Sequence, residues 1–123
     1  MTETTLDDIR GLMGYVYVAT PYSRYKLGHA IAHIHACKAT AELMRRGFAA
    51  VSPIAHSHPV AVHGPFDHLD QDFWLRQNVP LMDGASALVV VKLPGWRESV
   101  GVLDEIDRFI RDDKPIVFWD WSH

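Results

Sequence analysis

The chain has 123 residues, of which 48% are hydrophobic and 22% charged, a balance typical of one globular domain rather than a disordered chain. Its net charge of -3 argues against a dedicated nucleic-acid-binding surface, because phosphate backbones require clustered positive charge. A single cysteine excludes an intrachain disulfide and a cysteine-rich metal site. The apolar runs are too short to span a membrane and the polar start is unlike a signal peptide, so we expect a cytoplasmic protein with no membrane partner.

Short apolar runs alternate with longer helical patterns, which predicts an α/β fold: a small doubly wound, flavodoxin- or Rossmann-like parallel sheet with flanking helices. We expect strands over residues 15–19, 48–52, 88–93 and 116–119, and helices over 25–46, 67–78 and 99–111. Pro80 is expected to break or kink the second helix, and 54–66, with three histidines, two prolines and a glycine, is predicted to be a loop. In the last helix, the residues expected to face the core are Val102, Leu103, Ile106 and Ile110. Residues 1–123 should form one domain, with 1–13 as a loose N-terminal segment.

Ligands of such sheets bind at the carboxyl ends of the strands, where residues 20–24, 53–58 and 94–105 are expected to meet. The first segment suits an anion held by backbone N–H groups. Ser99 and Gly101, at the start of the last helix, are placed to hold a phosphate, and Glu105 is expected to face the same cleft with its anion favoured by the helix N-terminus. Each of these residues also has a purely structural interpretation, such as an N-cap for Ser99 and a solvated helix position for Glu105.

The chain contains eight histidines, and His29 and His33 have the i, i+4 spacing that can hold a metal. No cluster of carboxylates or cysteines completes a ligand set, so we expect no metal and no cofactor. His56 and His58 lie between two prolines at a strand end and are better placed to hydrogen-bond a polar ligand.

Four motifs occur in order: Tyr17-Val-Ala-Thr-Pro21, the SPIAHSHP stretch at 52–59, Gly95-Trp96, and Ser99-Val-Gly101-Val-Leu-Asp-Glu105. Together they resemble the nucleoside 2-deoxyribosyltransferase superfamily and, within it, a small bacterial and phage branch (DUF1937-like). The resemblance implies that Glu105 attacks the anomeric carbon of a nucleoside or nucleotide and forms a covalent glycosyl-enzyme. It also implies that the Tyr17 hydroxyl orients Glu105. Ser99 stands where the transferases have an aspartate and where similar monophosphate N-hydrolases have a phosphate-binding serine, which favours a nucleotide over a nucleoside.

The sequence departs from this family pattern at three positions. Asn78 stands where relatives often have an aspartate, so either Asp72 or a histidine such as His58 assists departure of the base in its place, or the activity is weak. Ser86 replaces a second aspartate, and Leu103 replaces a glycine, which predicts a narrower pocket. The candidate catalytic residues are therefore Glu105, Tyr17 and Asn78, and the candidate substrate contacts are Thr20, Ser23, Arg24, His56, His58, Asp72, Trp96, Ser99 and Gly101, with Trp96 (and less so Trp74) able to stack on a base.

The expected function is cleavage of the N-glycosidic bond of a nucleoside 5′-monophosphate, by hydrolysis or base exchange. A non-catalytic nucleotide-binding module of the same fold is the main alternative. A phosphoribohydrolase lacks support, because its PGGxGTxxE signature is replaced by Pro94-Gly95-Trp96-Arg97-Glu98-Ser99, and a histidine-rich metal protein is a further alternative. Four tryptophans and five phenylalanines are many for one small core, so we expect a homo-oligomer, at least a dimer.

Overall fold

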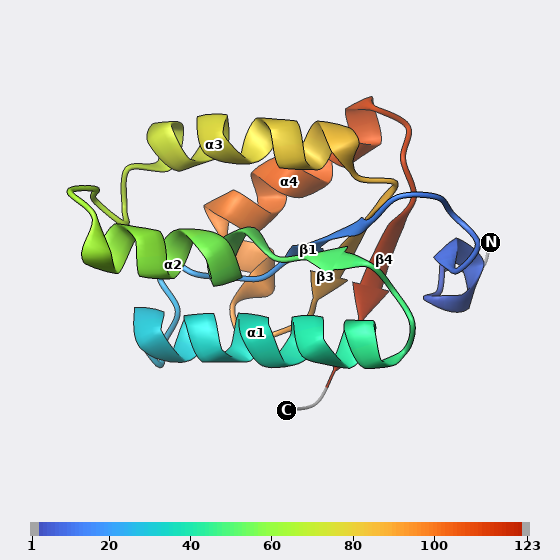
Figure 1. The fold of residues 1–123 in the computed structure, drawn as a ribbon, viewed down its shortest axis with the longest axis horizontal. Helices are drawn as coiled ribbons and strands as arrows, with labels where there is room; N and C mark the ends of the chain where they lie inside the picture. The colour runs from blue at the N-terminus through green and yellow to red at the C-terminus, as the bar shows by residue number, and fades with distance from the viewer. Residues whose placement is uncertain (1–2, 122–123) are drawn as a thin grey trace.

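A four-stranded parallel sheet forms the centre of the protein, whose residues 3–121 are described by a computed structural model (Figure 1). Its strands are β1 (Val16–Ala19), β2 (Ala50–Val51), β3 (Ala87–Val91) and β4 (Ile116–Trp119), in the order β2-β1-β3-β4. The chain first adds β2 on one side of β1 and then crosses to β3 on the other side. The strand order therefore switches between β1 and β3, and the carboxyl ends of the strands meet at one edge.

Helices cover both faces of the sheet, which confirms the predicted α/β fold. Helix α1 (His29–Arg45) lies on one face, and α3 (Gln71–Gly84) and α4 (Val100–Arg111) lie on the other (Figure 1). Helix α2 (Pro53–His63) packs against α1, α3 and β1. Two short 3-10 helices, η1 (Asp7–Ile9) and η2 (Trp96–Glu98), complete the described elements.

The alternation of side chains along β1 divides the interior into two cores. Val16 and Val18 point toward α1, whereas Tyr17 and Ala19 point toward α3 and α4. All four residues are buried, as expected for a central parallel strand that is covered on both faces. This register places the Tyr17 hydroxyl on the same side of the sheet as α4.

The segment predicted as a loop is instead the helix α2. The Ser52 side chain accepts a hydrogen bond from the Ala55 N–H (3.1 Å), and Pro53 occupies the first turn, where its missing N–H costs nothing. Pro59 lies inside the helix, which nevertheless continues to His63 and closes with the Gly64 N–H donating to the Val60 carbonyl (2.8 Å). The prolines and histidines therefore belong to a capped helix, although their pattern in the sequence is not typical of one.

Several predicted boundaries also move. Helix α1 begins at His29, after Gly28 with a φ of 92°, rather than at residue 25. Helix α3 begins at Gln71 and passes through Pro80 to Gly84, with Pro80 on its exposed side, where water can reach the carbonyl that loses its donor. The segment predicted to be loose is partly docked, since Ile9 at the end of η1 is buried in the core shared with α1, while residues 1–2 lie outside the described chain.

The buried face of α4 differs from the predicted one. Val102, Glu105 and Phe109 are buried and Ile106 packs beside them, whereas Leu103 and Ile110 are 47% and 63% exposed. The prediction followed the apolar residues, but the geometry turns a glutamate toward the sheet. Among residues 3–121, no helix has both the length and the apolar character needed to cross a bilayer.

Candidate active site

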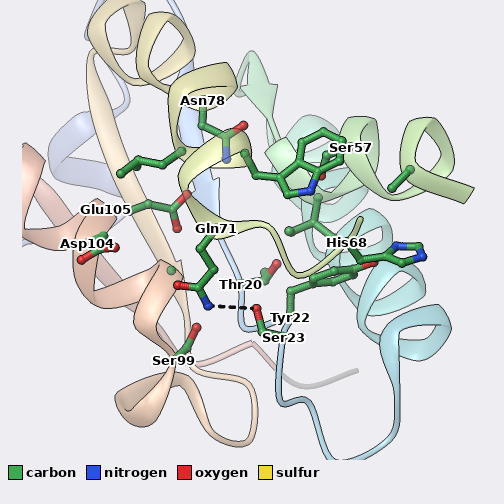
Figure 2. A pocket seen from close by; sticks show the side chains of 15 residues that line it. Thr20, Tyr22, Ser23, Ser57, His68, Gln71, Asn78, Ser99, Asp104 and Glu105 are labelled. Carbon is green, nitrogen blue, oxygen red and sulfur yellow. Dashed lines mark hydrogen bonds between the residues drawn. The ribbon is translucent and has the colours of Figure 1, made fainter. Parts of the chain in front are cut away.

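A pocket opens at the carboxyl ends of β1, β2 and β3, on the side of the sheet covered by α3 and α4. It is a cavity of about 90 Å³ whose wall draws on the loop after β1 and on helices α2, α3 and α4. Its lining is Thr20, Tyr22, Ser23, Ile54, Ser57, Ala61, His68, Gln71, Trp74, Leu75, Asn78, Ser99, Gly101, Asp104 and Glu105 (Figure 2). The position is where ligands bind in open α/β sheets.

Glu105 is the buried carboxyl group of this wall. It lies on α4, is 7% exposed, and its Oε2 accepts a hydrogen bond from the hydroxyl of Tyr17 on β1. Tyr17 is completely buried and its ring packs at 5.9 Å from Phe109. The sheet and the buried face of α4 thus fix the carboxyl group in orientation, as the resemblance implied for these two residues.

Burial raises the pKa of Glu105 from 4.5 to about 8; the Tyr17 hydrogen bond lowers this pKa and the charge of Asp104 raises it further. Burial therefore outweighs the stabilisation of the Glu105 anion that was expected from the helix N-terminus. Glu105 is the sixth residue of α4, and the helix dipole acts mainly within the first turn. Burial, and then the charge of Glu105, also raise the pKa of Tyr17 well above 10, which keeps its hydroxyl a donor.

The structure brings six of the other predicted residues to this pocket or to its edge. Thr20, Ser23, Asn78, Ser99 and Gly101 line it together with Glu105, and Arg24 lines an adjoining cavity. In Figure 2, Asn78 and Ser99 lie on opposite sides of Glu105. The Thr20 hydroxyl is buried and has no hydrogen-bond partner within the described chain, which is costly unless a ligand or water supplies one.

Four predicted contacts lie outside the pocket lining. His56 is exposed, because the helical course of α2 turns Ile54 and Ser57 inward instead. His58 does not line the pocket, but it is hydrogen-bonded to Tyr22, which does. Asp72 is exposed beside the lining face of α3, and Trp96 is partly buried at the edge of the core, with its ring centroid 5.6 Å from that of the exposed Phe118. Neither Asp72 nor His58 is therefore placed at the wall to replace an acid at position 78.

Two of the departures from the family pattern also lie away from the pocket. The Ser86 hydroxyl donates to the carbonyl of Met13, near the start of β1. Leu103 is half-exposed and does not line the cavity, so the predicted narrowing does not come from this residue. Asn78 is the departure that faces the site.

On α3, the sequence singled out Asn78 and, less strongly, Trp74, but not Gln71 and Leu75 on the same face. Gln71, Trp74, Leu75 and Asn78 follow the spacing i, i+3, i+4, i+7 and all line the cavity. This periodicity is present in the sequence, but by itself it indicates only a face that packs inward. The face lines a cavity because α2 is a helix that forms the opposite wall. The Gln71 amide donates to Ser23 Oγ across 3.5 Å, a long contact at the border with the adjoining cavity.

Tyr22 is the centre of a cluster of histidines behind the pocket. Its hydroxyl is hydrogen-bonded to Nδ1 of His58 (2.7 Å) and of His68 (3.2 Å), and its ring stacks on His29 at 4.5 Å. The pKa of His58 is lowered by burial and then by the charges of His33, His68 and His29. Across residues 3–121, no group of three or more histidine, cysteine, aspartate or glutamate side chains is placed to hold a metal ion.

The adjoining cavity is larger, about 400 Å³, and shares Tyr22, Ser23, Gln71 and Ser99 with the pocket. It also reaches Arg24, Lys26 and the first residue of α4, Val100. Ser99 caps this helix by accepting from the Val102 N–H (3.3 Å). Two positive side chains and a helix N-terminus therefore lie at the Ser99 end of the pocket and favour an anion, although the Glu98 carboxylate also lines this cavity.

Comparison with known families adds one finding. The family described as "Domain of unknown function (DUF1937)" matches residues 14–121. The chain belongs to this family. The match covers nearly every described residue and the whole site, and DUF1937 is the branch that the motifs resemble. Its description assigns no activity, and no curated protein matches the chain. The wider resemblance to the deoxyribosyltransferase superfamily stays a prediction.

Proposed function

We propose that this protein cleaves the N-glycosidic bond of a nucleoside 5′-monophosphate, with Glu105 as the nucleophile. The observation that carries the proposal is the buried Glu105 carboxyl group, held by the Tyr17 hydroxyl on the wall of the pocket. Burying a carboxyl group costs stability, and a fixed, partly desolvated carboxylate is what attack on an anomeric carbon requires.

The reaction has two steps. The Glu105 carboxylate forms a bond to C1′ of the sugar while the bond from C1′ to the base nitrogen breaks, and the electron pair leaves with the base. Water then attacks C1′, the ester bond to Glu105 breaks, and the proton released by the water neutralises the departing base. In base exchange, the nitrogen of a second base takes the place of the water.

The phosphate is expected at the Ser99 end. The start of α4 presents backbone N–H groups there, and Arg24 lies in the adjoining cavity. Neither Ser99 nor Gly101 carries a charge that would repel a phosphate. The buried Thr20 hydroxyl, which lacks a partner within the described chain, lines the same pocket as Ser99 and Glu105 and is suited to a sugar or phosphate oxygen.

The raised pKa of Glu105 sets a condition on this chemistry. With a pKa of about 8, the carboxyl group favours its protonated form at neutral pH, and it attacks only after losing that proton. Positive charge develops on the sugar ring in the transition state and stabilises the Glu105 anion at that moment. The kcat/KM for release of the base should therefore increase as the pH rises toward 8.

A non-catalytic nucleotide-binding module is the second candidate. Two features favour it: burial raises the pKa of Glu105 to about 8, which disfavours the nucleophilic carboxylate at neutral pH, and Asn78 supplies no acid to the leaving base. This candidate predicts that nucleotides bind without release of the base. The predicted homo-oligomer and the cytoplasmic location stay predictions.

Base release distinguishes the two candidates. The protein is incubated at pH 8 with the ribo- and deoxyribonucleoside monophosphates and with the parent nucleosides, and free base is measured by chromatography, with and without a second base as acceptor. Release from a monophosphate should disappear in Glu105→Gln and persist in Asp107→Asn, a matched change of an exposed carboxylate on the same helix. Binding without release from any compound would contradict the enzymatic proposal.

A further inference from the structure

The end of the pocket away from Ser99 is built differently from the anion end. It is formed by α2 and α3, and most of its lining is apolar: Ile54, Ala61, Trp74 and Leu75, with the polar groups of Ser57 and Asn78 among them. The Trp74 indole N–H donates to the Asp67 carbonyl (2.8 Å), which fixes the ring. Apolar walls with a few placed polar groups are the usual lining for a flat heterocycle.

The size of this pocket limits the heterocycle. The whole cavity measures about 90 Å³. A closed apolar cavity of about 150 Å³ holds one benzene ring, so a single six-membered ring already needs the open mouth of this pocket or a small outward movement of its wall, and a fused bicycle needs more. The fused bicycle of a purine would need Ile54, Trp74 or Leu75 to move. The phosphate has room in the adjoining cavity of about 400 Å³, which shares Ser99 with the pocket, whereas the sugar has to lie beside Glu105.

Asn78 supplies a side-chain amide that can form hydrogen bonds with the polar edge of such a ring. Its half-buried amide lines the pocket and makes no hydrogen bond to any residue from 3 to 121. In Figure 2 the amide and the Glu105 carboxyl group both point into the space between them. An amide offers one acceptor and two donors side by side, which matches a base edge where a ring nitrogen lies next to a carbonyl or an amino group. Pyrimidines and purines both have such edges, so the discrimination between them has to come from the size of the pocket and from the lack of an acid at position 78.

We propose that the base released by this protein is a pyrimidine and that Asn78 determines this specificity, an inference that rests on the proposed function. The absence of an acid at position 78 fits the same conclusion. When a pyrimidine leaves, the electron pair left on N1 spreads onto its carbonyl oxygens, and an amide N–H stabilises that charge without transferring a proton. The departure of a purine is normally assisted by protonation of its ring, and the amide of Asn78 cannot donate that proton.

The test measures binding and cleavage separately. Glu105→Gln is titrated calorimetrically with the uridine, cytidine, adenosine and guanosine monophosphates, in ribo and deoxy forms, and with ribose 5-phosphate as a probe without a base. The wild-type protein is assayed for base release from the same nucleotides. Pyrimidine nucleotides should bind at least about tenfold more tightly than purine nucleotides and should be cleaved in preference to them.

Variants assign the preference to the pocket. Asn78→Leu, made in the Glu105→Gln background, should weaken pyrimidine nucleotide binding by about ten- to a hundredfold and leave ribose 5-phosphate binding unchanged. The matched change Gln77→Leu, on the exposed side of α3, should do neither. Ile54→Ala, which removes three carbons from the wall, should narrow the preference by admitting purines.

The outcomes separate the two proposals. Purine nucleotides that bind and are cleaved as well as pyrimidine nucleotides overturn the specificity inference and leave the proposed function intact. Selective binding of pyrimidine nucleotides without any base release supports the inference about the pocket and overturns the proposed function. Absence of nucleotide binding and of cleavage overturns both, and an equal loss of ribose 5-phosphate binding in Asn78→Leu overturns the role given to Asn78.

Discussion

Replacing Glu105 by glutamine should remove a large pH dependence from the stability of the fold. Burial raises the pKa of Glu105 from 4.5 to about 8, so between these values the folded protein keeps a proton that the unfolded chain has released. The free energy of unfolding therefore falls as the pH rises through this interval. Since one pKa unit corresponds to about 1.4 kcal/mol, the interval amounts to at most about 5 kcal/mol.

Urea unfolding at pH 5, 6, 7, 8 and 9 measures this effect, with tryptophan fluorescence as the signal. In Glu105→Gln the Tyr17 hydroxyl keeps an acceptor, and no proton is exchanged at position 105. The variant should gain stability over the wild type by several kcal/mol between pH 5 and 8, with no further change above that. Asp107→Asn should follow the wild type, since Asp107 is exposed. A difference between Glu105→Gln and wild type that is the same at every pH would refute the reasoning.

Three further predictions follow from other contacts. Tyr17→Phe removes the hydrogen bond that lowers the pKa of Glu105, so the rise of kcat/KM with pH should shift to higher pH in a pH–rate profile. Gly14→Ala should cost more than about 1 kcal/mol by urea unfolding, because φ is 87° and the new Cβ would lie 2.9 Å from a side-chain oxygen, whereas Gly11→Ala, with nothing within 4 Å, should not. His58→Gln should lose less stability than wild type below about pH 6.5, because the pKa of His58 is lowered in the fold and charging it there opposes folding.

The strands could be predicted from the sequence because buried parallel strands are continuous apolar runs closed by turn residues. The β4 bounds, 116–119, are confirmed without change. Helix α2 could not be predicted in the same way, since its two prolines and three histidines carry no helical periodicity of apolar residues. Its existence depends on the Ser52 cap and on packing against α1 and α3, and packing is not visible in local sequence.

The residues of the site also fall into two groups, those that one local motif predicts and those that only long-range packing brings together. Ser99, Gly101 and Glu105 belong to one short motif at a helix start, and their common position in the pocket follows from helix geometry alone. The sequence did not single out Gln71, Tyr22 or His68. These side chains come together only because the start of α3 and the segment before it pack against the loop after β1. These contacts are long-range, and no single segment of the sequence encodes them.

The inward face of α4 carries the most information about function. On apolar burial alone, Leu103 and Ile110 would turn toward the sheet and Glu105 toward water. The helix does the reverse: it leaves these two apolar side chains half-exposed or more and buries a carboxyl group whose pKa rises to about 8 as a result. A leucine at position 105 would avoid that cost but would leave the buried Tyr17 hydroxyl without its acceptor. Under the proposed function, this cost is the cost of holding a nucleophile in place, and the pH dependence of unfolding and of base release would measure the two consequences of that one pKa.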